Sequence, residues 1–363
     1  MTIERQSLGT DADGDDAASV AAGHPHRPRW SWVASGWFVA TIWVGLSSPF
    51  FVRAYLPNET HLGISVPAPG SIYRWRSEGF SNTHIGPLGM PGRRTLPPSG
   101  TKAWALWGDS QAEGLPVADE KKLFAQVQRR TSRPVLPLGR SGDGLGDWIA
   151  QWPELEKAVP IETHCVLVVD FPDLLDLAPP TPPTPGRLGG LTARVPAFVV
   201  HATRNVLTEA DGSPRRLRFL PGPVPRSSET TDFKLADAPE MDEASPVTAS
   251  QIAAIRQSIK RIAAATTRPV KFIYCPPRPI IVHGQWVRED PHAAAAKVFA
   301  DLLADHPEAS RLAWIDMTDA FAESVRRGEI PLGFHNGEIG VGHVNEIGYR
   351  LIAEEIADRK RLF

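Results

Sequence analysis

Ser110 stands in the sequence Gly108-Asp109-Ser110, directly after the apolar run Ala103–Trp107. The run predicts a buried strand, and the residues after it predict a tight turn. A serine just past the carboxyl end of a strand lies where open α/β sheets place their ligands. Backbone N–H groups in such a turn can receive the negative charge that develops on an oxygen during acyl transfer. The same residues are equally typical of a simple Asp-Ser turn, so alone they do not establish a nucleophile.

Two later segments have the residue types that a serine nucleophile needs. Gly142 lies in a glycine-rich stretch after the next apolar run, and glycine there permits the backbone to approach a reacting group closely. His343 lies in a loop before the last predicted helix, from which it can reach the carboxyl edge of a parallel sheet. Asn345, two residues later, is placed to cap that helix.

In this order the segments resemble the motifs of the SGNH (GDSL-type) hydrolase family, and the resemblance covers residues 103–358. The family has a Gly-Asp-Ser nucleophile, a later glycine, a Gly-x-Asn-Asp segment and a near-terminal Asp-x-x-His. The resemblance implies that Ser110 is the nucleophile and His343 the general base. It also implies that the backbone N–H groups of Gly142 and Ser110 hold the oxyanion.

The third motif departs from the family's pattern. Pro172 stands where the family has its oxyanion asparagine. The loss of one such donor typically costs about 2.7–4 kcal/mol of transition-state stabilisation. Asn336 is a candidate to restore the missing amide, although capping a turn is the more ordinary role for an asparagine in such a loop.

The fourth motif departs as well, because Gly340 stands where the family has the aspartate that orients the histidine. That acid must come from elsewhere, or be replaced by a backbone carbonyl. Glu338 is the nearest carboxylate before His343, and Asp170 and Asp173 follow the predicted central strand. Each of the three is a candidate acid with a structural role as the alternative.

Neither a metal nor another cofactor is expected. The sequence has no spacing of His, Cys and carboxylate residues that supplies three or four converging ligands, and His335 alone does not make a site. Serine acyl chemistry also needs no cofactor.

The chain has 363 residues, a formal net charge of −2, 35 prolines and two cysteines. No basic excess exists to neutralise phosphates, so a nucleic-acid partner is not expected. Cys165 and Cys275 lie in apolar runs, and we interpret both as small buried residues. One disulfide between them stays an alternative.

Residues 30–52 contain no charged side chain and are rich in Trp, Phe, Val, Ile and Leu. A helix of this length reaches across a hydrocarbon core of about 30 Å, so the segment predicts a transmembrane signal anchor. A cleaved signal peptide is the alternative, but the apolar run is long and no Ala-x-Ala pattern follows it. Arg27 and Arg29 precede the segment and only Arg53 closely follows it, which places the catalytic domain outside the cytoplasm.

The remaining chain is predicted as one domain. Residues 1–29 predict a disordered tail, 53–100 a membrane-proximal linker and 101–363 the domain, with a Pro-rich insertion at 177–246. Within the domain, short apolar runs alternate with helical patterns. The runs are 103–107, 135–138, 165–169, 270–274 and 312–315, and the patterns are 120–130, 148–158, 250–265, 291–305 and 345–358. The alternation predicts an α/β, flavodoxin-like three-layer sandwich with a mostly parallel sheet.

The leading hypothesis is a membrane-anchored serine ester hydrolase or O-acyl (acetyl) transferase that acts on an acylated glycan or lipid of the envelope. The alternative is a catalytically weak domain of the same family that serves as a glycan-binding or assembly subunit. Pro172 and Gly340 favour the alternative, whereas Ser110, Gly142 and His343 together favour the enzyme.

Overall fold

The structure is a computed structural model that describes residues 30–51, 58–75, 78–179, 246–276, 279–282, 285–288, 292–337, 339–340 and 342–358. The chain divides into two compact units, residues 1–44 and residues 45–363. The predicted tail 1–29, Glu338 and most of the Pro-rich insertion lie outside the described residues.

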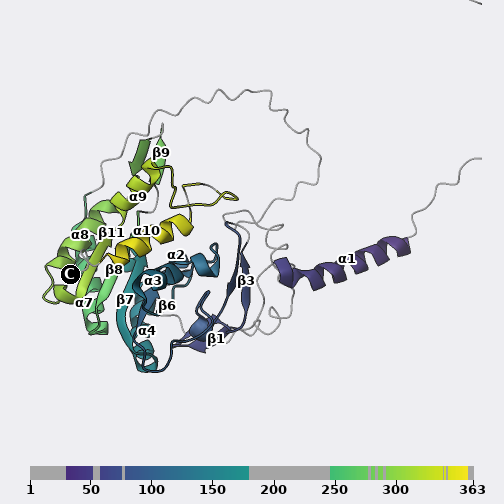
Figure 1. The fold of residues 1–363 in the computed structure, drawn as a ribbon, viewed down its shortest axis with the longest axis horizontal. Helices are drawn as coiled ribbons and strands as arrows, with labels where there is room; N and C mark the ends of the chain where they lie inside the picture. Colours follow the sequence, from purple (N-terminus) through teal and green to yellow (C-terminus); the bar gives the residue numbers. More distant parts are fainter. Residues whose placement is uncertain are drawn as a thin grey trace, which may run out of the picture. The chain divides into compact units, whose positions relative to one another are not determined.

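The charge-free segment near the N-terminus forms helix α1 (Trp30–Phe51), so its predicted helical structure is confirmed (Figure 1). In the described part of the chain, no helix is long and apolar enough to cross a membrane. The expected transmembrane span is therefore not supported.

A five-stranded parallel sheet forms the centre of the second unit. Across the sheet the strands are β6 (Val135–Pro137), β5 (Ala103–Trp107), β7 (Ile161–Val168), β8 (Val270–Tyr274) and β11 (Leu312–Asp316). In chain order β5 is the first strand of this sheet and β6 the second, and β6 lies at the edge beside β5. This is the strand order of flavodoxin-like folds. The predicted α/β class is confirmed, and every predicted apolar run lies in or overlaps one of these strands.

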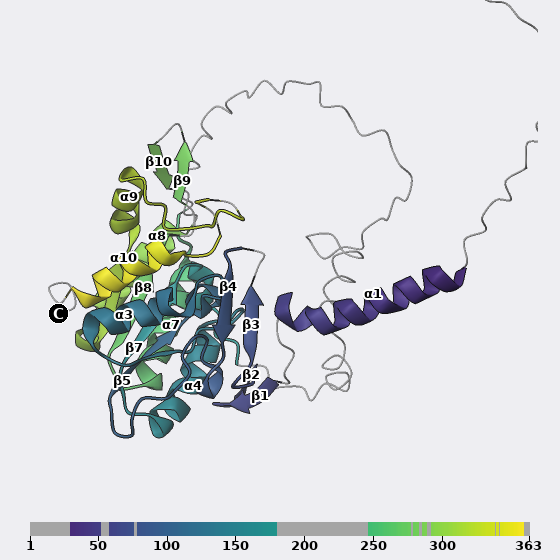
Figure 2. The same ribbon diagram turned by 45° about the vertical axis from the view of Figure 1, so that its right-hand side comes forward.

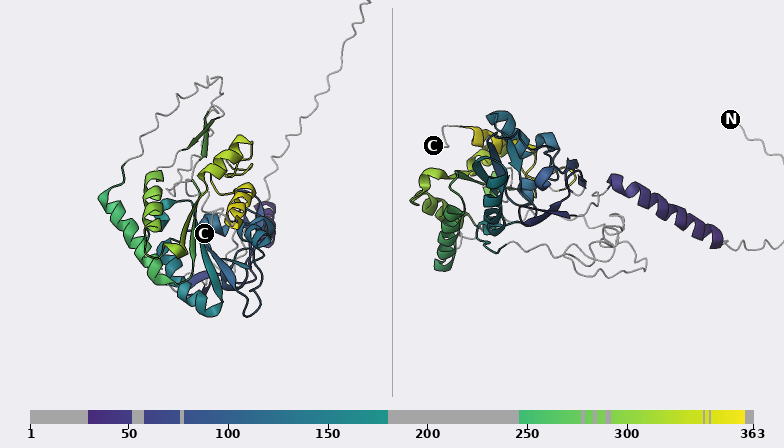
Figure 3. Two further views of the ribbon diagram at one scale, coloured as in Figure 1. Left: turned by 60° about the vertical axis from the view of Figure 1, so that its left-hand side comes forward. Right: turned by 90° about the horizontal axis from the view of Figure 1, so that it is seen from below.

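Helices cover both faces of this sheet (Figure 3). One face packs against α3 (Leu123–Thr131), α9 (Thr318–Arg326) and α10 (Glu346–Ala357), and the other against α4 (Leu145–Ala158), α7 (Ala249–Ala265) and α8 (Ala293–Ala304). Alternate residues of β8 face the two sides of the sheet. Phe272 packs in the core on the α4, α7 and α8 side, and Ile273 packs in the core on the α3, α9 and α10 side. The predicted helical patterns match these helices, except that α9 has no predicted counterpart. Cys165 and Cys275 are buried free thiols, as expected.

The stretch 53–100, for which the sequence predicts a linker, contains two antiparallel hairpins. They pair β1 (Asn58–His61) with β2 (Ile64–Pro67) and β3 (Ile72–Trp75) with β4 (Ser81–His84) (Figure 2). Smaller elements are α2 (Ser110–Glu113), the hairpin β9 (Pro279–Val282) and β10 (Gln285–Arg288), and the 3₁₀ turns η1 (Pro87–Gly89), η2 (Asp119–Lys121), η3 (Phe171–Leu174) and η4 (Ala309–Arg311). The hairpin β3–β4 contacts η2 and so belongs to the main unit.

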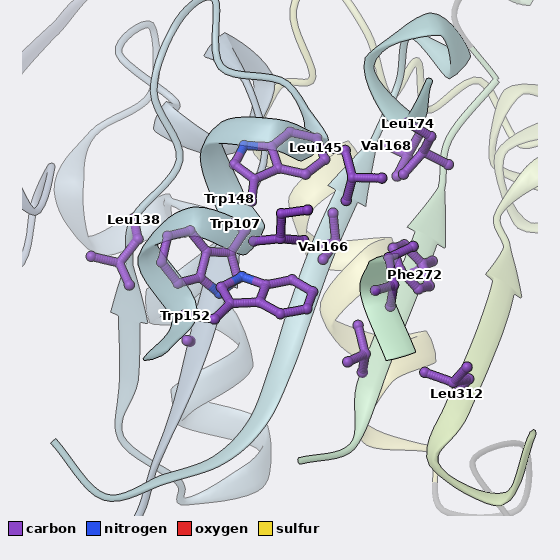
Figure 4. Close-up of a cluster of buried hydrophobic side chains, with 14 of the residues drawn as sticks. Trp107, Leu138, Leu145, Trp148, Trp152, Val166, Val168, Leu174, Phe272 and Leu312 are labelled. Atoms are coloured by element: carbon purple, nitrogen blue, oxygen red, sulfur yellow. The ribbon is translucent and has the colours of Figure 1, made fainter. Parts of the chain in front are cut away.

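A buried polar group lies beneath the strand that leads to Ser110. Trp107, at the end of β5, packs near Trp152 in the core on the α4 side of the sheet (Figure 4). Its Nε1–H donates to Nδ1 of the fully buried His164 at 3.0 Å, and His164 Nε2 lies 3.0 Å from Glu156 Oε1. Because Nδ1 accepts a hydrogen bond, the proton of a neutral His164 must be on Nε2, where it is donated to Glu156.

Protonation of His164 is therefore expected to destabilise the fold. Burial lowers the pKa of His164, and the hydrogen bond and charge of Glu156 only partly offset this. As the pH falls below about 6.5, the unfolded chain binds a proton that the folded chain does not, so stability is lost. Between about pH 7 and about pH 5, urea unfolding should show that the wild type loses at least about 1.4 kcal/mol more than His164→Gln, the equivalent of one pKa unit. Equal losses in the two proteins would contradict this account.

Candidate functional site

Ser110 is presented by a tight turn between β5 and α2, as its sequence predicts. Asp109 is the N-cap of α2, and its Oδ1 accepts a hydrogen bond from Gln111 N at 2.9 Å. Gly108 has φ +143°, and a Cβ atom there would lie 2.8 Å from the carbonyl oxygen of Leu167. Only glycine permits this close approach to β7, so the chain turns at once and leaves Ser110 at the carboxyl edge of the sheet.

His343 joins Ser110 to a carboxylate. Its Nε2 lies 3.1 Å from Ser110 Oγ, and its Nδ1 lies 2.5 Å from Glu78 Oε2. The backbone N–H of His343 also donates to Glu78 Oε1 at 2.8 Å. Glu78 therefore holds the histidine at two points, with the Nδ1 proton directed to the carboxylate and the Nε2 lone pair directed to the hydroxyl. Both side chains are largely buried, at 23% and 19% exposure.

The loop that carries His343 is fixed from both sides. Asn345 caps α10 as predicted, since its Oδ1 accepts from Ile347 N at 2.9 Å. On the other side, Gln111 Oε1 accepts from Val344 N at 2.8 Å. Because Gln111 directly follows Ser110, this hydrogen bond links the serine turn to the histidine loop.

Glu78 is the residue that sequence reasoning missed. It lies between β3 and β4, 265 positions before His343, in the stretch predicted as a linker. None of the motifs that mark the serine and the histidine includes this stretch, and no spacing rule connects it to them. The candidates Asp170 and Asp173 are not hydrogen-bonded to His343 in the described part of the chain, where both ring nitrogens face Glu78 and Ser110.

Asn336 holds the turn that carries Glu78. Its Oδ1 accepts from Gly79 N at 2.7 Å, and its Nδ2 donates to Gly79 O at 2.8 Å. The amide that the sequence offered as a replacement oxyanion donor is thus engaged with backbone. These contacts make Asn336 a clamp on Gly79, the residue next to Glu78, and its expected role as an oxyanion donor stays a prediction.

A buried lysine ties the same hairpin to the serine turn. Lys122 Nζ donates to Thr83 Oγ1 of β4 at 2.9 Å and to Gly114 O, at the end of α2, at 2.5 Å. Burial lowers the pKa of Lys122 to about 8, an effect that the charge of Asp119 opposes. Ser81 adds a hydrogen bond to Val117 O at 2.9 Å. The hairpin with Glu78 and the helix with Ser110 therefore form one hydrogen-bonded unit.

Gly142 lies in a turn beside α2. Asp143 N donates to Arg140 O at 3.2 Å around Gly142, whose φ of +85° suits glycine at the third position of such a turn. The turn is held against the site because Ser141 N donates to Glu113 Oε2 at 3.3 Å. Within the described residues, neither the N–H of Gly142 nor that of Ser110 has a hydrogen-bond acceptor. Both donors are available to a negatively charged oxygen.

Acidic residues crowd the adjacent end of β7. Burial, with the nearby charges of Asp109, Asp170 and Asp176, raises the pKa of Asp173 to about 7.

In the part of the chain that the structure describes, no group of three His, Cys, Asp or Glu side chains could hold a metal ion.

A scan against models of protein families and a search of curated proteins find no match. Among solved structures the chain is similar to the salicylyl-acyltransferase SsfX3 from a tetracycline biosynthetic pathway, at 12% identity, 73% coverage of this chain, 56% of that chain and a TM-score of 0.35. An acetyl xylan esterase (Est2A) from Butyrivibrio proteoclasticus is similar at 9% identity, with 74% coverage of this chain, 65% of that chain and a TM-score of 0.33. A family 3 carbohydrate esterase of Clostridium thermocellum is similar at 10% identity, with 70% coverage of this chain, 94% of that chain and a TM-score of 0.35. The chain thus spans less than two thirds of the first two structures.

The raised pKa of Asp173 predicts a pH-dependent effect on stability. Its folded pKa lies above its ordinary value of 3.8, so the stability that it contributes is present at low pH and is lost as the pH rises through about 7. Asp173→Asn should raise Tm at about pH 8 by about 2–4 °C, the shift expected for about 1 kcal/mol, and by much less at about pH 4. The exposed Asp305→Asn is the matched control and should show no such difference. An equal Tm change at both pH values would contradict the assignment.

Proposed function

We propose that this chain is a serine ester hydrolase or acyl transferase of the SGNH (GDSL-type) hydrolase family. The observation that carries the proposal is the continuous hydrogen-bonded series Ser110–His343–Glu78, with contacts of 3.1 Å and 2.5 Å. A nucleophile, a base and a group that orients the base, each within reach of the next, are the requirements of covalent acyl catalysis. Glu78 takes the place of the aspartate that is missing at Gly340.

The geometry assigns each group one task. Ser110 Oγ attacks the carbonyl carbon of the ester while His343 Nε2 takes its proton, and Glu78 stabilises the resulting imidazolium. The backbone N–H groups of Ser110 and Gly142 receive the oxyanion. The bond between the carbonyl carbon and the alkoxide then breaks while His343 protonates the departing alkoxide. The acyl group remains bound to Ser110. Water, or an acceptor hydroxyl in a transferase, attacks this ester with His343 again as base.

The substrate proposal rests on the sequence. An acylated glycan or lipid of the envelope, with the catalytic domain outside the cytoplasm, stays a prediction. The alternative function, a glycan-binding or assembly subunit with weak catalysis, now rests on Pro172 alone. Its other support, the glycine at 340, is offset by the contact between His343 and Glu78.

Labelling by a fluorophosphonate probe tests the proposed chemistry. The full chain should be labelled and should hydrolyse p-nitrophenyl acetate, because His343 activates Ser110. Ser110→Ala should abolish labelling, and His343→Ala should reduce it by at least about 100-fold. Ser141→Ala, in the neighbouring exposed turn, is the matched control and should be labelled like the wild type. A folded wild type that is neither labelled nor active would overturn the proposal and favour the binding subunit.

The clamp on the acid gives a second prediction. Asn336→Ala removes both hydrogen bonds to Gly79, so Glu78 loses its fixed position while the serine turn keeps its own contacts. We expect kcat for an activated ester to fall by about 10- to 100-fold with little change in KM, since a displacement of about 1 Å can cost this much. His335→Ala, one residue earlier, is the control. If Asn336→Ala instead raises KM and leaves kcat unchanged, Asn336 contacts substrate and is not a clamp.

A further inference from the structure

A cavity lies at the end of the sheet opposite to Ser110. Its volume is about 940 Å³, which is within the range of small-molecule sites. Residues at or next to the starts of four neighbouring strands line it, including Trp104 of β5, Glu162 of β7, Lys271 of β8 and Leu312 of β11. Because these strands are parallel, their amino ends share one edge, and Ser110 lies beyond the other.

Lys271 is unusual among these residues. It occupies a core-facing position of a central strand and is only 7% exposed. Lysine is almost never buried unless it is paired, since removing an ammonium from water is costly. Within the described residues, its Nζ makes no hydrogen bond and no ion pair, and it lies over the ring of Trp104, 4.7 Å from the ring centroid. A buried ammonium therefore borders the cavity with no carboxylate within ion-pair distance among the described residues.

The rest of the wall is also positively charged. Arg130, Arg133 and Arg311 line the cavity with Lys271, against the single carboxylate of Glu162. The arginines have partners of their own: Arg130 pairs with Glu354 at 2.9 Å, Arg133 with Glu162 at 3.6 Å, and Arg311 with Glu308. Among these four cations, Lys271 is thus the one without an ion pair in the described part of the chain.

Apolar side chains complete the wall. Trp104 and Ile356 line the cavity beside Lys271, and both pack against the core on the α10 side of the sheet. A small inorganic anion would leave these surfaces and most of the volume unused. The shape and chemistry favour a ligand with one anionic group and an apolar body.

We propose that this cavity binds an organic anion whose phosphate or carboxylate pairs with Lys271 and whose apolar part packs against Trp104 and Ile356. The site is separate from the acyl chemistry proposed for Ser110 and does not depend on it. Trp104 reports on occupancy, because an anion at Lys271 changes the charge held over its ring.

Calorimetric titration of the full chain tests this site with three probes of equal chain length: hexyl phosphate, hexanoate and hexanol. We expect at least one of the two anions to bind and the neutral alcohol not to bind; the anion that binds more tightly identifies the preferred head group. Lys271→Met, which keeps the length of the side chain without its charge, should weaken binding at least tenfold. Lys297→Met, on the exposed face of α8, should bind like the wild type.

Two further variants keep the outcome decisive. Ser110→Ala should bind the anion as tightly as the wild type, which separates this site from the proposed active site. If Lys271→Met does not fold, Lys271→Gln replaces it in the same titration. The proposal is overturned if neither anion binds, if hexanol binds equally well, or if the folded Lys271 variant binds with wild-type affinity.

Discussion

The contact between Glu78 and His343 is the interaction on which the proposed site depends. Its carboxylate reaches both Nδ1 and the backbone N–H of the histidine, so it sets the position of the loop as well as the tautomer of the ring. Without this carboxylate, nothing fixes the tautomer in which the Nε2 lone pair of His343 faces Ser110. Because Glu78 lies between β3 and β4, 265 positions before His343, the chemistry proposed at the sheet edge depends on a hairpin that precedes the sheet.

That hairpin is held by polar contacts that are mostly shielded from water. Lys122 joins β4 to the end of α2, Ser81 bonds to Val117, and Asn336 clamps Gly79. Buried hydrogen bonds of this kind are costly to leave unmade, because a group that loses its partner stays desolvated. The serine turn, the acid-bearing hairpin and the histidine loop are therefore expected to keep their geometry together or lose it together.

The sequence predicts most of the sheet and little of what surrounds it. β5 and β8 coincide with their predicted runs because buried parallel strands are short and mostly apolar, with Lys271 as the charged exception in β8. The sequence predicts a linker where the hairpins before β5 lie, since their four-residue strands are too short to show a clear alternation and two of them, β1 and β4, are polar. The charge-free segment predicts a helix, and α1 confirms it, although no helix in the described part of the chain is long and apolar enough to cross a membrane.

Ser110, His343 and Gly142 could be predicted because each lies in a local motif, whereas Glu78 becomes a partner only through tertiary contacts. The central claim is that Glu78 is the acid, and turnover of an activated ester by single carboxylate variants tests it most directly. We predict that Glu78→Gln lowers kcat by at least about 100-fold while the fold stays intact. Glu338→Gln and Asp170→Asn, the sequence-based alternatives, should stay within about threefold of the wild type. A Glu78→Gln enzyme with wild-type kcat, or a larger loss in Glu338→Gln, would contradict the account.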